Sequence, residues 1–529
     1  MDVLQTTAVL SELPRERTRL LDNLGRLRRE VGPITPELSD ALADHMSIRR
    51  GEVHEVVSFY GFLQVPVDTR RVCTGPVCDC FGARDLLAST PGAIEVPCLG
   101  HCELAPVATA GDRVLPGGEE RPVEHLTNDG PALGLGTVDE TLADYARRGG
   151  LSLLREPLSR ERILEELGAA GLVGYGGAGF PTAVKWEAVL RSGGEPVVAV
   201  NADEGEPGTF KDRYVMERRP HLLLEATLVA MAFAGAREGH VYLREEYATA
   251  RHRLAAAIEE LRAAGFLEGR TLELVVGAGA YIAGEETAML ESMEGRRAMP
   301  RLKPPFPTEV GYLARPTLMN NVETLAHVPA ILTNGGAWWA ALGTRGAAGT
   351  RLWSVSGAVA RPGCYEAPNG STLRELVEGH AGGFAGEAGA IVPGGAASGI
   401  LSPSALDVPL TRDALREHGA AVGSAAVQVF PASYPPLRLL GETMRFFAEE
   451  SCQKCTPCRI GNRAVHHLVE RLEHGEAAMP RHQLEEWLEA MERTSICGLG
   501  QAAPVPVRAA MRIWPELFAP LDAETSRVA

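Results

Sequence analysis

The sequence contains no long apolar run and comparatively few basic residues. Its most apolar stretch, LLLEATLVAMAFAGA at 222–236, is short for a bilayer span and includes Glu225, so we expect a buried helix there and no direct membrane insertion. Lys and Arg total 52 against 68 Asp and Glu, which gives a formal net charge of −16. Nucleic acids and anionic membranes both attract clustered basic side chains, so this balance predicts neither as a partner.

The sequence also shows no internal repeat at a fixed period and no long low-complexity tract. The opening MDVLQTTAVLSELPRERTRLL carries charges and lacks an uninterrupted apolar core, so we expect no signal peptide. The cysteines gather at ligand-like spacings. Because thiolates must stay reduced to bind iron, this grouping indicates a reducing compartment, and we expect the cytoplasm. At 529 residues, 45% of them hydrophobic, the chain can form three or more soluble globular domains.

A cysteine triplet and a distant fourth cysteine form the most informative pattern. Cys452, Cys455 and Cys458 are spaced C-x2-C-x2-C in ESCQKCTPCRIG, and Cys497 lies in SICGLG. Four thiolates from one short turn and one remote loop suit a cubane [4Fe–4S] cluster, because each iron needs one soft anionic ligand. A structural zinc site is the alternative, although an all-cysteine zinc site usually shows two C-x2-C pairs.

A second cysteine set lies nearer the N-terminus. Cys73 and Cys78 are spaced C-x4-C, whereas Cys98 and Cys102 are spaced C-x3-C. These gaps are wider than those of zinc knuckles, and each pair can hold one iron of a two-iron cluster, so we predict a [2Fe–2S] site. Two further cysteines are interpreted as small packed residues or idle thiols: Cys80, which could compete as a ligand, and Cys364.

The helix and strand patterns predict an α/β multidomain chain. Residues 1–65 have helical periodicity and predict a helical bundle, and 66–150 follow a thioredoxin-like order of strands and helices. Strands and helices alternate from 151 to 345, which predicts an α/β domain with a largely parallel sheet. Residues 346–432, rich in Gly, Pro and short β runs, predict a β-grasp (ubiquitin-like) domain. Residues 433–529 predict a helical bundle that carries the [4Fe–4S] cysteines.

A glycine-dense turn, GLVGYGGAGFPTAVKW at 171–186, precedes a predicted helix. Gly174, Gly176 and Gly179 satisfy G-x-G-x-x-G, and Asp203 follows in VVAVNADEG. A Rossmann fingerprint also requires a strand before the glycines, but SRERILEELGAAGL predicts a helix there. The turn would still let the backbone approach a phosphate or a ring closely, so alone it is weak evidence for a nucleotide site.

Two later segments are too polar for buried strand ends. NADEGEPGTFKDR at 201–213 combines acidic and basic residues around Pro-Gly, and a second glycine-rich turn at 277–307 places Glu285 and Glu286 at a helix start. Either glutamate alone could be a solvated acid at a helix start. Together with the first turn, the segments supply the glycines, amides, carboxylates and aromatic rings that a flavin and a nicotinamide nucleotide need.

As a set, GGAGFPT, NADEGEPGTFKDR, RLKPPFP, NNVETLAHVP, SCQKCTPCRIG and SICGLGQAAP resemble the NADH-binding flavoprotein subunit of respiratory complex I. The chain is also similar to the diaphorase subunits of NAD-dependent formate dehydrogenases and NAD-reducing hydrogenases. Residues 1–150 resemble the thioredoxin-like [2Fe–2S] subunit of the same enzymes, fused here in front. The resemblance covers nearly the whole chain.

This resemblance implies a cofactor for each motif. For FMN it implies Gly174, Gly176, Lys185, Asn201, Asp203, Glu204, Tyr281, Gly284, Glu285, Asn320 and Asn321. For NAD(H) it implies Phe180, Glu206, Glu286, Lys303 and Phe306, with Glu206 and Glu286 as the catalytic residues that orient the nicotinamide. It implies [4Fe–4S] ligation by Cys452, Cys455, Cys458 and Cys497, and [2Fe–2S] ligation by Cys73, Cys78, Cys98 and Cys102.

The chain departs from the family pattern at several positions. Tyr175 stands where Arg or Leu is usual, Ala283 where Cys is frequent, and Ala188 where a second aromatic residue is common. The first two changes could tune the flavin potential, and the third leaves fewer rings for adenine. The stretch between Cys78 and Cys98 is shorter than in the free-standing subunit, which suggests a trimmed domain; a relic fold without a cluster is the alternative.

The implied activity is hydride transfer between NAD(H) and FMN, followed by single-electron transfer through the clusters. No segment suggests a molybdenum, nickel–iron or quinone site, so other redox subunits must complete the enzyme. We expect the catalytic subunit of a molybdenum- or tungsten-containing formate dehydrogenase, with an NAD-reducing hydrogenase or a complex I-like enzyme as alternatives. Two other classes remain open: an electron-relay subunit that has lost its flavin, and a Rossmann-type NADPH-dependent reductase with structural zinc.

Overall fold

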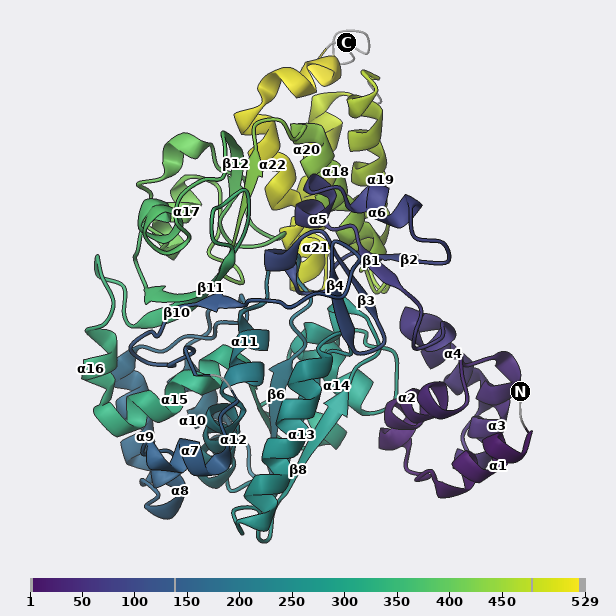
Figure 1. The fold of residues 1–529 in the computed structure, drawn as a ribbon, viewed down its shortest axis with the longest axis vertical. Coiled ribbons are helices and arrows are strands. Elements are labelled where there is room, and N and C mark those ends of the chain that lie inside the picture. The colour runs from purple at the N-terminus through teal and green to yellow at the C-terminus, as the bar shows by residue number, and fades with distance from the viewer. Residues whose placement is uncertain (1–2, 138, 477–478, 523–529) are drawn as a thin grey trace.

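The computed structural model describes residues 3–137, 139–476 and 479–522 (Figure 1). Its N-terminal helices form the predicted bundle, drawn in purple around buried leucines such as Leu24 and Leu42. Thr35 caps one helix by accepting a hydrogen bond from the Leu38 N–H. The helices are α1 (Val3–Glu12), η1 (Arg17–Arg19), α2 (Leu20–Glu30), α3 (Pro36–Met46), α4 (Arg50–Phe59) and η2 (Gly61–Gln64).

A small sheet with the order β2-β1-β3-β4 follows, in which β1 pairs parallel with β2 and antiparallel with β3. The expected succession of strand, helix, strand and hairpin is therefore present. Of the first cysteine set, Cys73 ends β1, Cys78 lies within α5, Cys98 follows β2 in a loop, and Cys102 begins η3. The elements are β1 (Arg71–Cys73), α5 (Pro76–Cys80), α6 (Ala83–Ala88), β2 (Ile94–Val96), η3 (Cys102–Leu104), β3 (Val107–Ala110) and β4 (Arg113–Pro116).

After β4 the chain leaves this sheet and packs against later segments. Asn128 donates a hydrogen bond to the Glu366 carbonyl (2.8 Å), and Glu366 accepts from the Leu133 N–H (3.0 Å). This stretch therefore fastens the N-terminal module to the rest of the chain. It contains β5 (Leu126–Thr127), which joins the edge of a sheet formed much later in the sequence, then α7 (Leu142–Arg147) and α8 (Ser152–Arg155).

The central domain contains a parallel sheet with the order β8-β7-β6-β9. Its apolar strands are buried, so the polar residues at their carboxyl ends face the crevice where α/β sheets bind ligands. The elements are α9 (Arg160–Ala170), α10 (Thr182–Arg191), β6 (Val197–Ala202), α11 (Lys211–Arg218), α12 (Pro220–Ala234), β7 (Glu238–Leu243), α13 (Ala248–Ala263), β8 (Thr271–Val276), η4 (Tyr281–Gly284), α14 (Glu286–Met293), η5 (Tyr312–Ala314), β9 (Thr317–Asn321), α15 (Val322–Asn334) and α16 (Gly336–Ala340).

The next domain is a mixed five-stranded sheet with its own hydrophobic core, as expected for a β-grasp domain. Its strand order is β12-β13-β10-β11-β5. The elements are β10 (Thr350–Gly357), β11 (Gly363–Pro368), the π-helical η6 (Glu375–His380), β12 (Ala388–Val392), η7 (Pro403–Ala405), α17 (Arg412–Glu417) and β13 (Ala426–Pro431).

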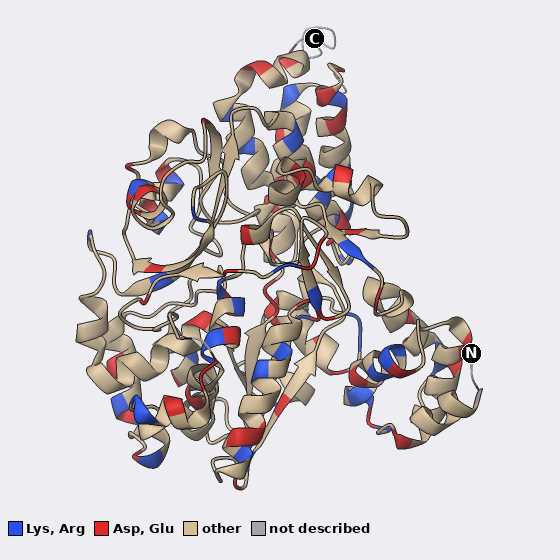
Figure 2. Cartoon of the chain, in the orientation of Figure 1, with Lys and Arg blue, Asp and Glu red and all other residues tan. Residues whose placement is uncertain are grey.

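The C-terminal helices stand together at the top of Figure 1. Among the described residues, no helix is long and apolar enough to cross a membrane. Acidic and basic residues are interspersed over the helices in this view (Figure 2). The elements are α18 (Pro436–Glu449), α19 (Thr456–Glu473), α20 (Arg481–Thr494), α21 (Gly498–Ala502), α22 (Pro504–Ile513) and η8 (Pro515–Phe518).

Candidate functional site

The carboxyl ends of β6 and β9 bring four of the expected site residues together. Asn201 pairs with Asn321 in the strand register. The Asn201 amide donates to the Gly284 carbonyl (2.7 Å) and accepts from the Asp203 N–H (3.2 Å). The Asp203 Oδ2 atom is buried and has no hydrogen-bond partner among the described residues, and burial raises the Asp203 pKa well above its usual range. A buried oxygen of this kind needs a hydroxyl or N–H donor, which a ribityl chain or a flavin ring offers.

The two asparagines at the end of β9 are fixed by hydrogen bonds. Trp186 donates its indole N–H to Asn320 Oδ1 (3.0 Å). Asn321 caps α15 by accepting from the Thr324 N–H (3.3 Å), and it donates to Asp212 (2.6 Å). Their side chains are thus held in place before any ligand binds.

Asp212 belongs to a buried charged group that the sequence analysis did not identify. Lys211 Nζ lies 2.8 Å from Asp212 and 2.9 Å from Glu323. Burial raises the Asp212 pKa, although Lys211 opposes the shift. Charged residues within the otherwise buried helices α11 and α15 were the available signal, because buried charges must be paired. Through Asp212, this charged group holds the Asn321 side chain in place.

Glycines leave room beside these side chains. A Cβ atom on Gly284 would lie 2.8 Å from the Asp203 carbonyl oxygen, and one on Gly176 would lie 3.2 Å from the Asn321 Cβ. A Cβ on Gly174 would make only an ordinary contact, 3.6 Å from the Phe180 carbonyl oxygen. The close approaches, together with the orphaned Asp203 oxygen, fit a flat ring and a polar chain such as those of FMN.

Glu286 lies at the start of α14 between two lysines. Its carboxylate is 3.0 Å from Lys303 Nζ and 3.4 Å from Lys185 Nζ. Burial alone would raise the Glu286 pKa, but the two lysines reverse this effect and lower it. Glu285 caps the helix instead, since it accepts from the Thr287 and Ala288 N–H groups at 2.9 Å each. Glu286 is thus the carboxylate of this pair that is free of helix capping.

The expected aromatic residues are largely open to solvent. Phe180 is 49% exposed and Phe306 is 51% exposed, so their ring faces are available to stack on a base. Glu206 lies against the domain that contains β10–β13, where its carboxylate accepts from the Ala397 N–H (2.8 Å). Burial raises its pKa. The structure therefore places Glu206 at a domain interface and Glu286 between the lysines.

Glu204 is occupied by interactions within the protein. It accepts from the backbone N–H groups of Asp212 (2.9 Å) and Arg213 (3.1 Å) and from the Tyr247 hydroxyl (2.9 Å). Burial raises its pKa to about 7. This geometry makes Glu204 the cap of α11, which orders the loop after β6.

The four C-terminal cysteines lie at or near the starts of α19 and α21, two helices that contact each other. Burial raises the Cys458 pKa to about 12, and the nearby charges of Cys455, Cys497 and Cys452 act in the same direction. Asn462 donates to Cys458 Sγ (3.3 Å). Burial also raises the Cys497 pKa, to about 11, although the Leu499 and Gly500 N–H groups oppose this shift. Four thiols with N–H donors around them fit a [4Fe–4S] cluster, whose sulfurs accept such bonds. Within the described residues, no group of three or more His, Cys, Asp or Glu side chains is arranged to hold a single metal ion.

Tyr281 lies in η4, together with Gly284, and packs against α18, the helix that precedes these cysteines. Its N–H donates to Glu450 (2.8 Å), and its ring centroid is 4.8 Å from that of Phe446 on α18. Burial and then the charges of Glu206 and Cys497 raise the Tyr281 pKa. The charges of a predicted nucleotide-site glutamate and of a predicted cluster cysteine therefore both act on Tyr281.

The N-terminal cysteines also converge. Cys73 interacts with Cys78 and Cys98, which raises its pKa, whereas hydrogen bonds from Cys102 and Cys73 lower the Cys98 pKa. Cys98 Sγ accepts from the Gly100 N–H (3.3 Å). The donor set fits a [2Fe–2S] cluster.

The two remaining cysteines, Cys80 and Cys364, are not among the predicted cluster ligands. Cys80 is partly buried at the end of α5, where burial raises its pKa to about 11. Cys364 is buried within β11. Both positions agree with the interpretation as packed thiols.

Four family models match this chain in the expected order. They are the thioredoxin-like [2Fe–2S] ferredoxin (6–129), the Nuo51 FMN-binding domain (167–330), the SLBB domain (353–400) and the NADH-ubiquinone oxidoreductase-F iron–sulfur binding region (438–520). The predicted multidomain α/β fold, the FMN and the two clusters are therefore confirmed.

Curated relatives match along most of their length. The F 2 subunit of the NADH-quinone oxidoreductase of Rhizobium meliloti is 44% identical over 386 residues, which cover 70% of this chain and 92% of the relative. The F subunit of the NADH-quinone oxidoreductase of Rhodobacter capsulatus is 40% identical over 68% of this chain and 86% of its own. A chain of the NAD+-reducing [NiFe]-hydrogenase in the H2-reduced state is similar over 97% of this chain and 94% of its own, with a TM-score of 0.84 and 33% identity.

Proposed function

This chain belongs to the family of the NADH-quinone oxidoreductase F subunits, and we propose that it forms the NAD(H)-binding end of a hetero-oligomeric, NAD-dependent formate dehydrogenase. Its FMN-binding, [2Fe–2S] and [4Fe–4S] domains make it an NADH-oxidising flavoprotein subunit. The single observation that carries the site assignment is the orphaned Asp203 oxygen beside the Gly176 and Gly284 cradle.

The chemistry that a bound FMN would supply is hydride acceptance from NADH and release of the electrons one at a time. Asp203 and Asn201 would hold the polar chain and the ring edge of FMN, and the glycines would let the backbone approach it. Glu286 and Glu206 orient the nicotinamide and its amide, and Phe180 and Phe306 supply ring faces for the adenine. The protein positions the two rings rather than moving a proton.

The choice of partner rests on the fused architecture and on the sequence, in which no segment suggests a molybdenum, nickel–iron or quinone site. The [2Fe–2S] module and the flavin module share one chain, as in the expected diaphorase subunits. A molybdenum- or tungsten-containing catalytic subunit would exchange electrons with the [4Fe–4S] end, in the cytoplasm and in the direction of NAD+ reduction. The likeness to a chain of an NAD+-reducing [NiFe]-hydrogenase, which spans both modules, favours a hydrogenase partner as the second candidate.

Co-purification with untagged neighbouring subunits tests this proposal. We expect the complex to reduce NAD+ with formate and to contain molybdenum or tungsten. NAD+ reduction with hydrogen and a nickel content would establish the second candidate instead. NADH oxidation that proceeds only with a quinone, and with neither formate nor hydrogen as a donor for NAD+ reduction, would refute both.

A further inference from the structure

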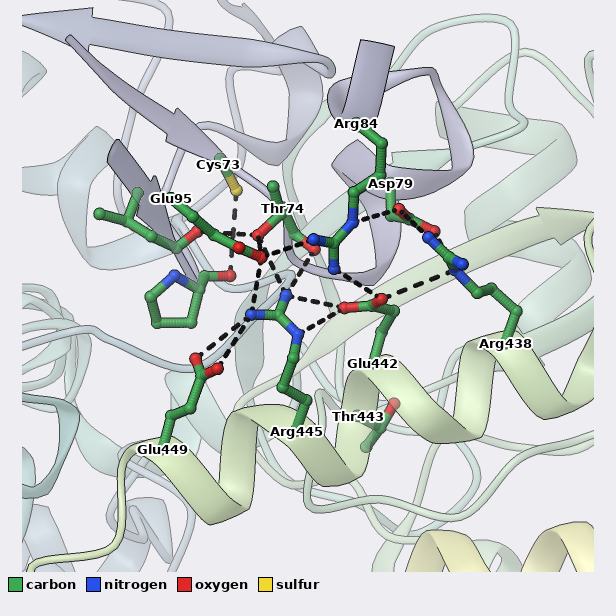
Figure 3. Close-up of polar contacts among 12 residues, drawn as sticks. Cys73, Thr74, Asp79, Arg84, Glu95, Arg438, Glu442, Thr443, Arg445 and Glu449 are labelled. Carbon is green, nitrogen blue, oxygen red and sulfur yellow. Dashed lines mark hydrogen bonds and ion pairs between the residues drawn. The ribbon is translucent and has the colours of Figure 1, made fainter. Parts of the chain in front are cut away.

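An interdomain ion-pair network joins the N-terminal module to α18 (Figure 3). We use this name for seven charged residues whose side chains contact one another across the domain boundary. The module contributes Asp79, Arg84 and Glu95, and α18 contributes Arg438, Glu442, Arg445 and Glu449. The network lies beside the turn that carries Cys73 and Cys78.

Arg445 occupies the middle of this network. Its guanidinium donates to the Thr74 carbonyl (3.1 Å) and hydroxyl (3.0 Å), directly after Cys73 in the chain. It also pairs with Glu442 (2.7 Å), Glu95 (2.9 Å) and Glu449 (3.2 Å). Because Arg445 is only 13% exposed, these interactions are weakly screened by solvent.

A second arginine holds the other end of the same turn. Arg438 donates two hydrogen bonds to Asp79, both at 3.0 Å, and the Tyr434 hydroxyl donates a third (2.6 Å). Burial alone would raise the Asp79 pKa, but the hydrogen bonds from Arg438 and Tyr434 lower it overall. Asp79 directly follows Cys78 and Thr74 directly follows Cys73. Side chains of α18 therefore hydrogen-bond next to both ligand cysteines of this turn.

The other two ligand cysteines are held by a different domain. Arg244, at the end of β7, donates to the Cys98 carbonyl (2.9 Å), and Arg213 on α11 donates to the Gly100 carbonyl (3.1 Å). The Cys73–Cys78 half of the site therefore depends on α18, and the Cys98–Cys102 half depends on the central domain. The same α18 ends at Glu449, shortly before the Cys452 turn.

We propose that Arg445 is a positioning residue for the [2Fe–2S] site. It holds the Cys73–Cys78 turn against α18 through the Thr74 carbonyl and hydroxyl, and it places a largely buried positive charge next to the residue that follows Cys73. Reduction of a bound cluster by one electron would add one negative charge to it, with no bond formed or broken. A neighbouring positive charge stabilises the reduced state, so Arg445 raises the midpoint potential of this cluster. The inference rests on the [2Fe–2S] cluster and is independent of the formate partner.

Redox titration of anaerobically prepared protein, followed by electron paramagnetic resonance, tests the role of Arg445. In Arg445→Gln, we expect the [2Fe–2S] midpoint to shift to a more negative potential, so that the reduced-to-oxidised ratio at the wild-type midpoint falls on the order of tenfold. Arg445→Lys keeps the charge and should recover most of this shift. Glu449→Gln removes a negative charge from the same network and should shift the midpoint in the opposite direction. Arg493→Gln, which removes an exposed arginine on α20, is the matched control and should change nothing.

Two results would overturn the inference: unchanged midpoints in both Arg445→Gln and Glu449→Gln, or shifts of the same sign in both. If Arg445→Gln loses the [2Fe–2S] signal while retaining flavin and the [4Fe–4S] signal, recovery in Arg445→Lys supports the positioning role, and failure to recover contradicts it. Absence of a [2Fe–2S] signal in the wild type would instead overturn the assignment of the cluster to this domain.

Discussion

Replacement of Glu286 should separate nucleotide binding from flavin binding. The carboxylate is paired with Lys303 at 3.0 Å and with Lys185 at 3.4 Å, and its side chain is 27% exposed. A hydrogen bond to a charged group contributes about 1.5–3 kcal/mol. In Glu286→Ala the KM for NADH should therefore rise roughly 10- to 150-fold, because the nicotinamide loses this partner. Flavin content should fall much less than the affinity for NADH does.

Steady-state NADH oxidation with an artificial acceptor, together with fluorescence of the flavin released on denaturation, measures both effects. Glu375→Ala removes a glutamate that pairs with Arg345 in the β10–β13 domain (2.7 Å), and it serves as the matched control with unchanged KM. Unchanged kinetics in Glu286→Ala would refute the placement of this carboxylate, as would a loss of flavin that accounts for the whole loss of activity.

Three further predictions follow from other parts of the site. Gly284→Ala places a Cβ atom 2.8 Å from the Asp203 carbonyl oxygen, so bound FMN should be lost while acid-labile sulfide stays constant; normal flavin content would contradict the cradle. Cys497→Ser should abolish the [4Fe–4S] signal and leave the [2Fe–2S] signal intact, and loss of neither would argue against ligation. Burial alone would raise the Glu103 pKa, but Arg213 and His125 lower it to about 2, so the stabilisation by this carboxylate is present above pH 4.5 and is lost as the pH falls towards 2. Glu103→Gln should lower the free energy of unfolding by about 3 kcal/mol at pH 7. Urea unfolding of the cluster-free chain should show a smaller difference between wild type and variant in acid, and a difference independent of pH would refute this reasoning.

Local sequence patterns predicted most of the secondary structure around the site. The apolar run before Asn201 forms β6, and the helical pattern before Gly174 forms α9, so the rejection of a Rossmann fingerprint there was correct. Glu285 and Glu286 stand at the start of α14 as expected. These features depend on the alternation of apolar residues and on caps, which the residues themselves encode.

Contacts between distant segments could not be predicted in this way. Arg445 and Thr74 are 371 residues apart in the sequence, and neither lies in a motif that suggests the other. β5 is two residues long and has no strand pattern of its own, so its pairing with β11 depends on tertiary packing. Lys211 and Glu323 likewise become a pair only when α11 and α15 pack together.

The central claim is that the nucleotide end of this chain exchanges electrons in pairs and the metal end handles them singly, with FMN between them. Its most direct test compares anaerobic wild type with flavin-depleted Gly284→Ala by electron paramagnetic resonance after addition of NADH. We predict signals of reduced clusters in the wild type and none in the variant, although dithionite should produce the same signals in both. Cluster reduction by NADH in the flavin-free variant, or its failure in the flavin-loaded wild type, would contradict the account.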